Sequence, residues 1–226
     1  MNKLPEVTKN LLAINVLMYL ATIVMAKQGV NLTNTLGLHF FMASDFAPYQ
    51  IVTYMFMHSG FSHLFFNMFA LYMFGGVLEK VWGAKRFLIY YFVCGIGAGL
   101  LQEAVQYASY LQDGLAAYEV VRTPSGIIPM DMFLNLWTTV GASGAIYAIL
   151  LGFGMLFPNE RMFIFPLPFP IKAKFFVVGY AAIELFLGVF NTRDGIAHFA
   201  HLGGMVFGLV MILYWRKKRK IGGPYV

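Results

Sequence analysis

The chain has 226 residues, of which 59% are hydrophobic and 12% are charged, and its net charge at pH 7 is +6. Soluble globular domains carry roughly 25% charged and about 45–50% apolar residues, so this composition excludes a water-soluble core and indicates a chain whose solvent is mostly lipid. No polar stretch is long enough for a separate soluble domain, so we expect one membrane domain over residues 1–226.

Six apolar stretches are long enough, or nearly so, to cross the hydrocarbon core of a bilayer, which needs about 20 residues and at least ~17. We expect membrane spans at residues 11–26, 61–78, 87–108, 136–157, 175–190 and 196–215. Residues 27–60 are partly apolar, but Asp45 and Pro48 interrupt them, so we predict a first loop that lies partly in the membrane interface. Between the fourth and fifth stretches, a regular helix is excluded by Pro166, Pro168 and Pro170.

The basic residues predict the orientation of these spans. With a cytoplasmic N-terminus, the inside segments contain Lys3, Lys9, Lys80, Lys85, Arg86, Arg161, Lys172, Lys174, Arg216, Lys217, Lys218, Arg219 and Lys220. The outside segments contain only Lys27, Arg122 and Arg193. A seventh span in the first loop would invert every later loop and remove this asymmetry, so the positive-inside rule predicts six helices with both termini cytoplasmic. The positive charge is therefore a topology signal, and we expect a lipid bilayer as partner and no nucleic acid.

Few polar side chains lie in the predicted spans, where a central charge costs about 2.5–3.5 kcal/mol on insertion scales. They are His63 and Asn67 in the second span, Ser143 in the fourth, Glu184 in the fifth, and His198 and His201 in the sixth. The second, fourth and sixth spans all run inward, which places Ser143 about 10 Å and His201 about 8 Å below their outer ends at 1.5 Å per residue. His63 and Asn67 are four residues apart and share a helix face near the same end. We therefore predict that three helices bring these four residues together in the outer leaflet.

Small residues flank the serine and follow the histidine. Gly141 and Gly144 surround Ser143, and Gly204 and Gly208 form a small-xxx-small pair that lets two helices pack closely. A hydrogen bond between a serine nucleophile and a histidine base, about 2.6–3.2 Å long, needs such an approach. A lone serine or a lone glycine pair is more often structural. The combination indicates a functional site.

Three motifs occur in order along the chain: His58-Ser-Gly-Phe-Ser-His63-Leu-Phe-Phe-Asn67, then Gly141-Ala-Ser143-Gly144-Ala-Ile-Tyr147, then His201-Leu-Gly-Gly204 with Gly208. Together they resemble the rhomboid proteases over nearly the whole chain, and the predicted helix count and orientation agree. The resemblance implies an all-α, six-helix polytopic bundle. It further implies an intramembrane serine endopeptidase that hydrolyses transmembrane protein substrates, with its site opening to the outside of a bacterial inner membrane.

The resemblance also implies roles for individual residues. Ser143 would be the nucleophile and His201 its general base, while His63, Asn67 and the backbone N–H of Ser143 would form an oxyanion hole. Tyr147 would pack on the His201 ring, and His58 would be a structural polar residue. The helix over 175–190 would be a lateral gate.

One position departs from the family pattern. Many family members carry Trp-Arg ahead of the helix-two histidines, where this chain has Tyr49-Gln50. The arginine's hydrogen bonds are therefore lost, and the sequence leaves open how the first loop is anchored.

Several alternatives bear on the chemistry. No acidic residue is obviously paired with His201, so we favour a Ser–His dyad; Glu184 is the only candidate third member, and a structural or cavity-facing glutamate is the preferred interpretation. A metal site built from His58, His63, His198 and His201 is conceivable, but we expect no metal and no cofactor, and the HExxH zinc motif is absent. Cys94 is the single cysteine, which excludes an internal disulfide.

Two other functions compete with proteolysis. A non-catalytic rhomboid-like protein would bind or escort transmembrane clients, but it would be expected to lack the serine or the histidine. A transporter would show repeated, broken helices around a midplane site, whereas this polar cluster is off-centre. The substrate and the oligomeric state do not follow from the sequence.

Overall fold

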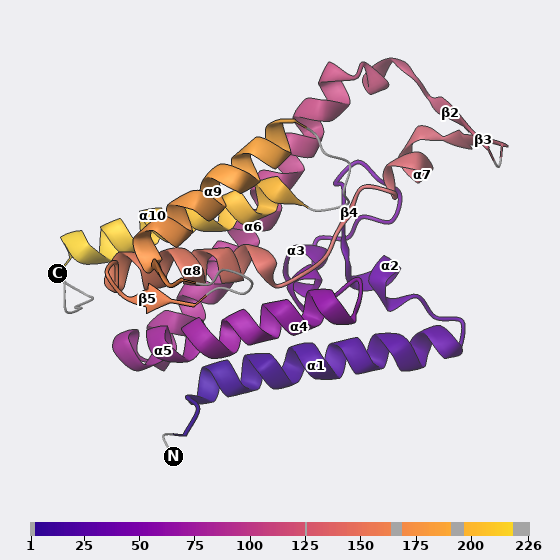
Figure 1. Ribbon diagram of the computed structural model, residues 1–226. Coiled ribbons are helices and arrows are strands. Elements are labelled where there is room, and N and C mark those ends of the chain that lie inside the picture. Colours follow the sequence, from indigo (N-terminus) through magenta and orange to yellow (C-terminus); the bar gives the residue numbers. More distant parts are fainter. Residues whose placement is uncertain (1–2, 125, 164–168, 191–196, 219–226) are drawn as a thin grey trace.

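The computed structural model describes residues 3–124, 126–163, 169–190 and 197–218 (Figure 1). Its long helices are α1 (Glu6–Lys27), α6 (Ala84–Gln112), α8 (Ser143–Leu156), α9 (Ala173–Val189), α10 (His198–Lys217), and a continuous helical segment made of α4 (Phe61–Ala70), the π-turn η2 (Leu71–Gly75) and α5 (Gly76–Trp82). Within these described ranges, four segments are long and apolar enough to cross a membrane: Glu6–Ala26, Phe61–Trp82, Ala84–Gln112 and His198–Lys217. The chain is therefore mostly helical, while α8 and α9 are shorter, at 14 and 17 residues.

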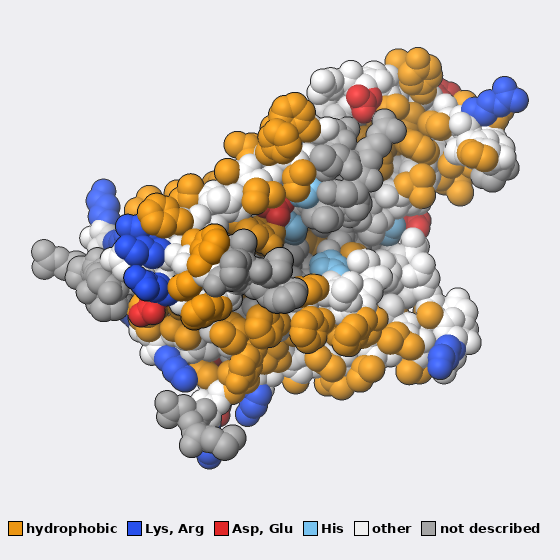
Figure 2. Space-filling model, in the orientation of Figure 1, with side chains coloured by type: hydrophobic (Ala, Val, Ile, Leu, Met, Phe, Trp, Pro, Cys, Tyr) orange, Lys and Arg blue, Asp and Glu red, His pale blue; other side chains and the backbone are white. Residues whose placement is uncertain are grey.

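Successive long helices along the chain run in opposite directions through one bundle (Figure 1). Helix α10 packs against α6, α8 and α9, and one continuous core extends from α1 to α10. Helix α1 begins, and α5, α8 and α10 end, at the same end of the bundle. Figure 2 shows that Lys and Arg side chains gather there, so we call it the basic end. The described residues do not include Arg193, Arg219 and Lys220, which entered the predicted orientation, or Pro166 and Pro168 of the predicted non-helical connector.

A buried glutamate fixes the start of α1. The free N–H groups of the first turn of a helix need acceptors. Glu79 of α5, which is 4% exposed, accepts from Val7 N–H at 3.0 Å and from Thr8 N–H at 2.7 Å. The Thr8 hydroxyl donates to the same carboxylate at 2.7 Å. The Glu79 carboxylate therefore serves a structural role, because both of its oxygens accept hydrogen bonds at the start of α1.

Helix α8 begins later than its apolar pattern predicts. The predicted span started at residue 136, but α8 begins at Ser143. Residues Thr138–Thr139 instead form strand β4, which pairs antiparallel with β1 (Leu38–His39) of the first loop. β-branched threonines favour such pairing, and Gly141 then takes a φ of +128°, which a helix does not allow. Ser143 is thus the first residue of α8, and the prediction that it lies about seven residues into a helix was wrong.

The first loop packs into the bundle. It contains α2 (Leu32–Leu36), β1, α3 (Gln50–Thr53) and the 3-10 turn η1 (Tyr54–Phe56). The buried apolar side chains of this loop include Leu38, Phe40, Tyr54, Met55 and Met57. The Tyr54 hydroxyl donates to the Gly95 carbonyl of α6 at 2.6 Å, and its carbonyl accepts from Gly141 N–H at 2.9 Å. The loop therefore braces the strand that leads into α8.

An arm extends from the end of the bundle opposite the basic end (Figure 1). At 1.5 Å per residue, the 29 residues of α6 span about 43 Å, more than the ~30 Å of a hydrocarbon core. Beyond α6 come η3 (Leu115–Ala117), the hairpin of β2 (Val120–Thr123) and β3 (Gly126–Pro129), and α7 (Met130–Leu134). A small core joins this arm to the first loop; it contains Phe40, Ala43, Tyr110, Met130 and Leu134. Near the basic end, β5 (Arg161–Met162) pairs with β6 (Ile171–Lys172).

Gln50 anchors the first loop at the position where the sequence left the anchor open. Its side chain is 1% exposed. The amide oxygen accepts from His39 N–H at 3.3 Å and from Ala47 N–H at 3.1 Å. The amide nitrogen donates to the carbonyls of Thr35 at 3.2 Å and Asp45 at 2.9 Å. One neutral amide thus ties four points of the loop together.

Replacing Gln50 by alanine is expected to destabilise the protein. The change leaves buried N–H and C=O groups without partners, at about 1–3 kcal/mol for each such group. Partial rehydration would offset some of this, so we expect a fall of about 5–10 °C in the thermal unfolding midpoint. The matched control is Tyr49→Ala, because Tyr49 is 51% exposed and its hydroxyl donates only to Thr35 O at 3.2 Å. Equal midpoints for the two variants would contradict the anchoring role.

Candidate active site

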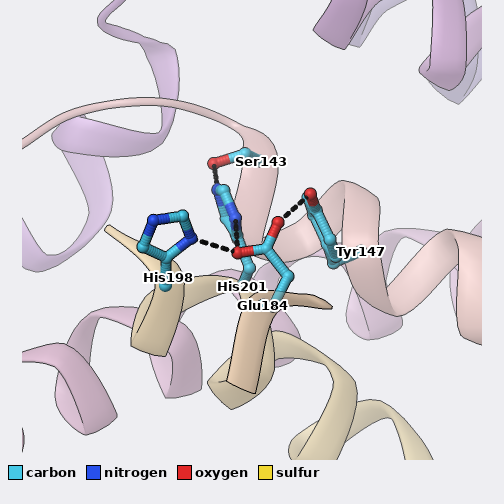
Figure 3. A network of polar contacts seen from close by, with 5 residues as sticks. All are labelled: Ser143, Tyr147, Glu184, His198 and His201. Atoms are coloured by element: carbon cyan, nitrogen blue, oxygen red, sulfur yellow. Dashed lines mark hydrogen bonds and ion pairs between the residues drawn. The ribbon is translucent and has the colours of Figure 1, made fainter. Parts of the chain in front are cut away.

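Ser143 and His201 meet where α8 begins and the first turn of α10 ends. The Nε2 atom of His201 lies 2.8 Å from Ser143 Oγ (Figure 3). This is the distance at which a histidine can take the proton of a serine hydroxyl. His201 is 8% exposed, so the pair lies in a largely desolvated setting. The two side chains can act as nucleophile and base.

The late start of α8 matters for the electrostatics at Ser143. The first N–H groups of a helix have no acceptor within the helix, and the aligned peptide dipoles put partial positive charge at that end. Ser143 therefore presents its N–H, together with its hydroxyl, at a terminus that favours an anion. A serine seven residues into the helix would have its N–H bonded to the preceding turn. The corrected helix boundary thus suits anion binding better than the predicted one.

Two glycines allow α8 and α10 to come together. A Cβ atom built on Gly204 would lie 1.8 Å from the Gly144 carbonyl oxygen. One turn later, a Cβ on Gly208 would lie 3.1 Å from the Ala148 side chain and 2.5 Å from the Tyr90 hydroxyl. The backbones of the two helices therefore touch next to the Ser143–His201 pair. The short distance between Nε2 and Oγ depends on this contact.

Tyr147 covers the His201 ring. It lies one turn after Ser143 on α8, and its ring stacks on His201 with 4.1 Å between centroids and 7° between planes. This stacking fixes the plane of the imidazole.

His63 comes close to the same point from α4. A Cβ on Gly141 would lie 2.8 Å from His63 Nε2 and 3.5 Å from Ser143 Oγ, so both atoms border the same small space. The other ring nitrogen, Nδ1, accepts a weak bond of 3.5 Å from Ser59 N–H and lies 3.0 Å from Ser59 Oγ. Because a backbone N–H can only donate, Nδ1 is an acceptor, and in the neutral ring the proton is then on Nε2. His63 thus directs an N–H toward the space beside Ser143.

Asn67 lies one turn further along α4. It is 7% exposed, and its amide nitrogen finds no hydrogen-bond acceptor within the described parts of the chain. Buried amide donors are nearly always bonded, so an unused one calls for an explanation. Among the described residues, the Asn67 amide nitrogen therefore has no acceptor and can donate to another group.

A model of the Rhomboid domain matches residues 45–218 of the chain. The chain belongs to the rhomboid family. It is 28% identical over 164 residues to the rhomboid protease AarA of Providencia stuartii, an alignment that covers 71% of this chain and 53% of that protein. It is 30% identical over 169 residues to Rhomboid protein 1, mitochondrial, of Saccharomyces cerevisiae, covering 74% and 42%. It is 24% identical over 173 residues to Rhomboid-like protein 16, chloroplastic, of Arabidopsis thaliana, covering 76% and 49%.

The chain spans about half the length of these three rhomboid-family relatives. All the residues singled out from the sequence as site residues lie within the matched range 45–218. As a rhomboid-family member with four long apolar helices, it is a multi-pass integral membrane protein.

His58 lies beside His63, just before α4. It is 2% exposed, and its ring meets His63 edge-on with 5.0 Å between centroids. Burial, reinforced by the neighbouring His63, lowers the pKa of His58 to about 4. The ring is therefore neutral at pH 7.

Glu184 comes within reach of His201, where the sequence had left its role open. Its carboxylate is 5% exposed. The Tyr147 hydroxyl donates to Oε1, His198 Nδ1 lies 2.6 Å from Oε2, and His201 Nδ1 lies 3.0 Å from the same oxygen (Figure 3). The sequence carried three signals for this cluster: Tyr147 four residues after Ser143, His198 three before His201, and an acidic residue in the neighbouring span.

Proposed function

We propose that this rhomboid-family chain is an intramembrane serine endopeptidase that hydrolyses peptide bonds of transmembrane protein substrates. The observation that carries the proposal is the 2.8 Å contact between His201 Nε2 and Ser143 Oγ at the N-terminus of α8. A serine that only caps or packs a helix has no need of an imidazole base at this distance.

The reaction follows from the geometry around Ser143. The Oγ atom attacks the substrate carbonyl carbon while its proton moves to His201 Nε2, and the carbonyl oxygen becomes an oxyanion. Collapse of this intermediate breaks the C–N bond, and His201 returns the proton to the leaving amine. Water then attacks the acyl ester with His201 again as base, which releases the new carboxylate and restores Ser143.

The oxyanion would be held by three donors. The backbone N–H of Ser143 lies at the helix N-terminus, His63 Nε2 borders the space beside Oγ, and the Asn67 amide has no other acceptor in the described chain. Donors fixed before the reaction stabilise the developing charge strongly in a site with little water. We infer that His63 and Asn67 are there for this purpose.

Replacing Asn67 or His63 by alanine is expected to lower kcat about 10²–10³-fold, the usual cost of one oxyanion donor. KM should change little, because the donors act on the transition state more than on the bound substrate. Steady-state kinetics on a transmembrane substrate checks both values. The control is Asn34→Ala, in the exposed part of the first loop, where the side chain reaches Asp45. Variants of Asn67 and His63 with parental kcat would remove the oxyanion assignment.

We further propose a topology of six spans with both termini in the cytoplasm and a single domain over residues 1–226. The basic end would face the cytoplasm, and Ser143 would open to the outside of a bacterial inner membrane. Helix α8 supports this, because its 14 residues reach only about 21 Å and leave its first residue recessed. Helix α1, although it precedes the family match, contributes Leu11 to the common core.

The test of the proposed function uses the purified full chain in liposomes. A serine-directed fluorophosphonate should label it, peptide mapping should locate the label at Ser143, and a transmembrane substrate should be cleaved. Substrates with small or helix-breaking residues near the cut should be preferred, because a helix must unwind to expose its carbonyl. A non-catalytic rhomboid-like protein would bind such segments with neither labelling nor cleavage, and that result would replace this proposal.

A further inference from the structure

The two ring nitrogens of His201 have different neighbours. Nε2 faces Ser143 Oγ at 2.8 Å, and Nδ1 faces Glu184 Oε2 at 3.0 Å. An ionised carboxylate can only accept, so the ring hydrogen belongs on Nδ1. In the neutral ring, Nε2 then keeps its lone pair toward the serine hydroxyl, which is the form that a general base needs.

The carboxylate also selects one of two ring orientations. Stacking on Tyr147, with 7° between planes, fixes the plane of His201. It does not distinguish the ring from one turned by 180°, which would exchange Nδ1 with a carbon atom. The contact with Glu184 distinguishes these two orientations, because Nδ1 can donate to an oxygen and the carbon atom cannot.

We propose that Glu184 is a positioning residue for His201, so that the site works as Ser143–His201–Glu184 and not as a dyad. The inference rests on the proposed serine-protease function. When Ser143 Oγ bonds to the substrate carbon, its proton moves to His201 Nε2 and the ring becomes a cation. The proton on Nδ1 stays there, and the Glu184 carboxylate stabilises the cation across 3.0 Å.

The remaining partners of Glu184 keep its carboxylate in place. Tyr147 of α8 donates to Oε1, and His198 of α10 lies 2.6 Å from Oε2. A buried charge costs several kcal/mol unless it is paired and hydrogen-bonded, and these contacts provide the pairing. Both partners also belong to the helices that carry Ser143 and His201, so the carboxylate is fixed relative to the reacting pair.

The contact with His201 is close but bent, because the Nδ1–H does not point straight at an acceptor. Contacts of this kind often straighten only when substrate is bound. Helix α9 has few buried residues in its described length, namely Ala173, Val177 and Glu184. The first two lie in its first five residues, so Glu184 is the buried residue in the later part of α9, where Tyr180 also packs on Tyr147 and Gly188 lies close to Phe199. We infer that the alignment of His201 depends on how α9 is seated.

A metal ion is the competing explanation for the same cluster. Glu184, His198 and His201 each offer a donor atom, and these atoms lie within 4.8 Å of one another. A metal held there would need the Nδ1 lone pair of His201, which would move the ring hydrogen to Nε2 and remove the base that faces Ser143. The two explanations therefore differ in the expected effect of chelation: the rates change if a metal is bound there and stay the same if Glu184 positions His201.

The experiment compares Glu184→Gln, Glu184→Asp and the parent protein in liposomes. Glutamine keeps the length of the side chain and one acceptor oxygen but loses the charge. We expect kcat and the fluorophosphonate labelling rate of Glu184→Gln to fall about 10–100-fold, with KM changed less than about twofold. Glu184→Asp keeps the charge and should recover part of both rates. Chelator treatment of the parent should change neither rate.

The matched control is Glu103→Gln. Glu103 is also a buried glutamate, 8% exposed, but it lies on α6 and accepts from Phe41 N–H at 2.8 Å. Its replacement should affect thermal stability and leave kcat at the parental level. Parental rates in Glu184→Gln, equal losses in the two glutamine variants, or a chelator-induced change in either rate that zinc reverses would each overturn the inference. A parent protein without labelling or cleavage would instead refute the proposed function itself.

Discussion

Ser143→Ala is expected to abolish cleavage of a transmembrane substrate, with a fall in kcat of about 10⁴–10⁶-fold. The variant keeps the helix N-terminus and the His63 and Asn67 donors but has no atom to form the acyl ester. His201→Ala should cost nearly as much, because without Nε2 at 2.8 Å the hydroxyl is a weak nucleophile. Residues that act as one unit are not additive, so the double variant should be no slower than either single variant. Substrate cleavage and fluorophosphonate labelling measure the losses.

Ser109→Ala is the control for this experiment, because Ser109 lies near the end of α6, away from the site. It should cleave and be labelled like the parent. Thermal midpoints of the Ser143 and His201 variants should stay close to that of the parent, which separates loss of chemistry from loss of folding. Parental cleavage by Ser143→Ala would mean that another group is the nucleophile.

Hydropathy predicted where the helices are. Each of the six apolar stretches corresponds to a helix in the described structure, and four of these helices are long and apolar enough to cross a membrane. Five of the six start within about five residues of the expected position, because burial in lipid demands a long apolar run. The predicted start of the fourth helix was wrong for a local reason. Residues 136–142 are apolar enough to continue the span, but Thr138 and Thr139 pair with the first loop and Gly141 has a positive φ. Hydropathy does not register strand pairing with a segment about 100 residues earlier.

Spacing predicted which side chains lie at a common level of the bundle, but neither the start of α8 nor the rotation of the helices. The sequence placed His201 and Ser143 at one level, and the structure puts their side chains in contact. Glu184 was known to be at a similar level, yet its contact with His201 depends on how α9 is turned against α10. The hydrophobic pattern of α9 leaves this rotation open, because lipid-facing and helix-facing positions are both apolar.

The anchoring of the first loop could not be predicted from the sequence for a different reason. The sequence identified Tyr49-Gln50 as a departure from the family pattern and left open how the first loop is anchored. The structure has Gln50 bonded at four points, because an amide carries both donors and acceptors and an arginine carries donors only. A neutral amide can thus join N–H and C=O groups of one loop without burying a charge.

Gly204→Ala is expected to disable the site without touching a reacting group. The added Cβ would lie 1.8 Å from the Gly144 carbonyl oxygen and 2.6 Å from its carbon, and neither backbone atom can turn aside as a side chain would. Helix α10 must therefore move away from α8. Ser143 is next to Gly144, and His201 is one turn before Gly204, so the movement lengthens the 2.8 Å contact between them. A displacement of about 1 Å costs about 10²-fold in rate, and overpacking costs about 1–3 kcal/mol.

Gly179→Ala separates this effect from the general effect of a methyl group on a helical glycine. Gly179 lies within α9, and a Cβ there meets no atom within 4 Å, so the change should leave activity at the parental level and raise helix stability by about 0.5–1 kcal/mol. Gly208→Ala should fall between the two, because the nearest atom to its Cβ is the Tyr90 hydroxyl at 2.5 Å, on a side chain that can shift. Both kcat and the thermal midpoint should therefore be lowest for Gly204→Ala, whose Cβ meets backbone atoms, intermediate for Gly208→Ala and highest for Gly179→Ala. If Gly204→Ala matched Gly179→Ala in both, close approach of α8 and α10 would not be what aligns Ser143 with His201.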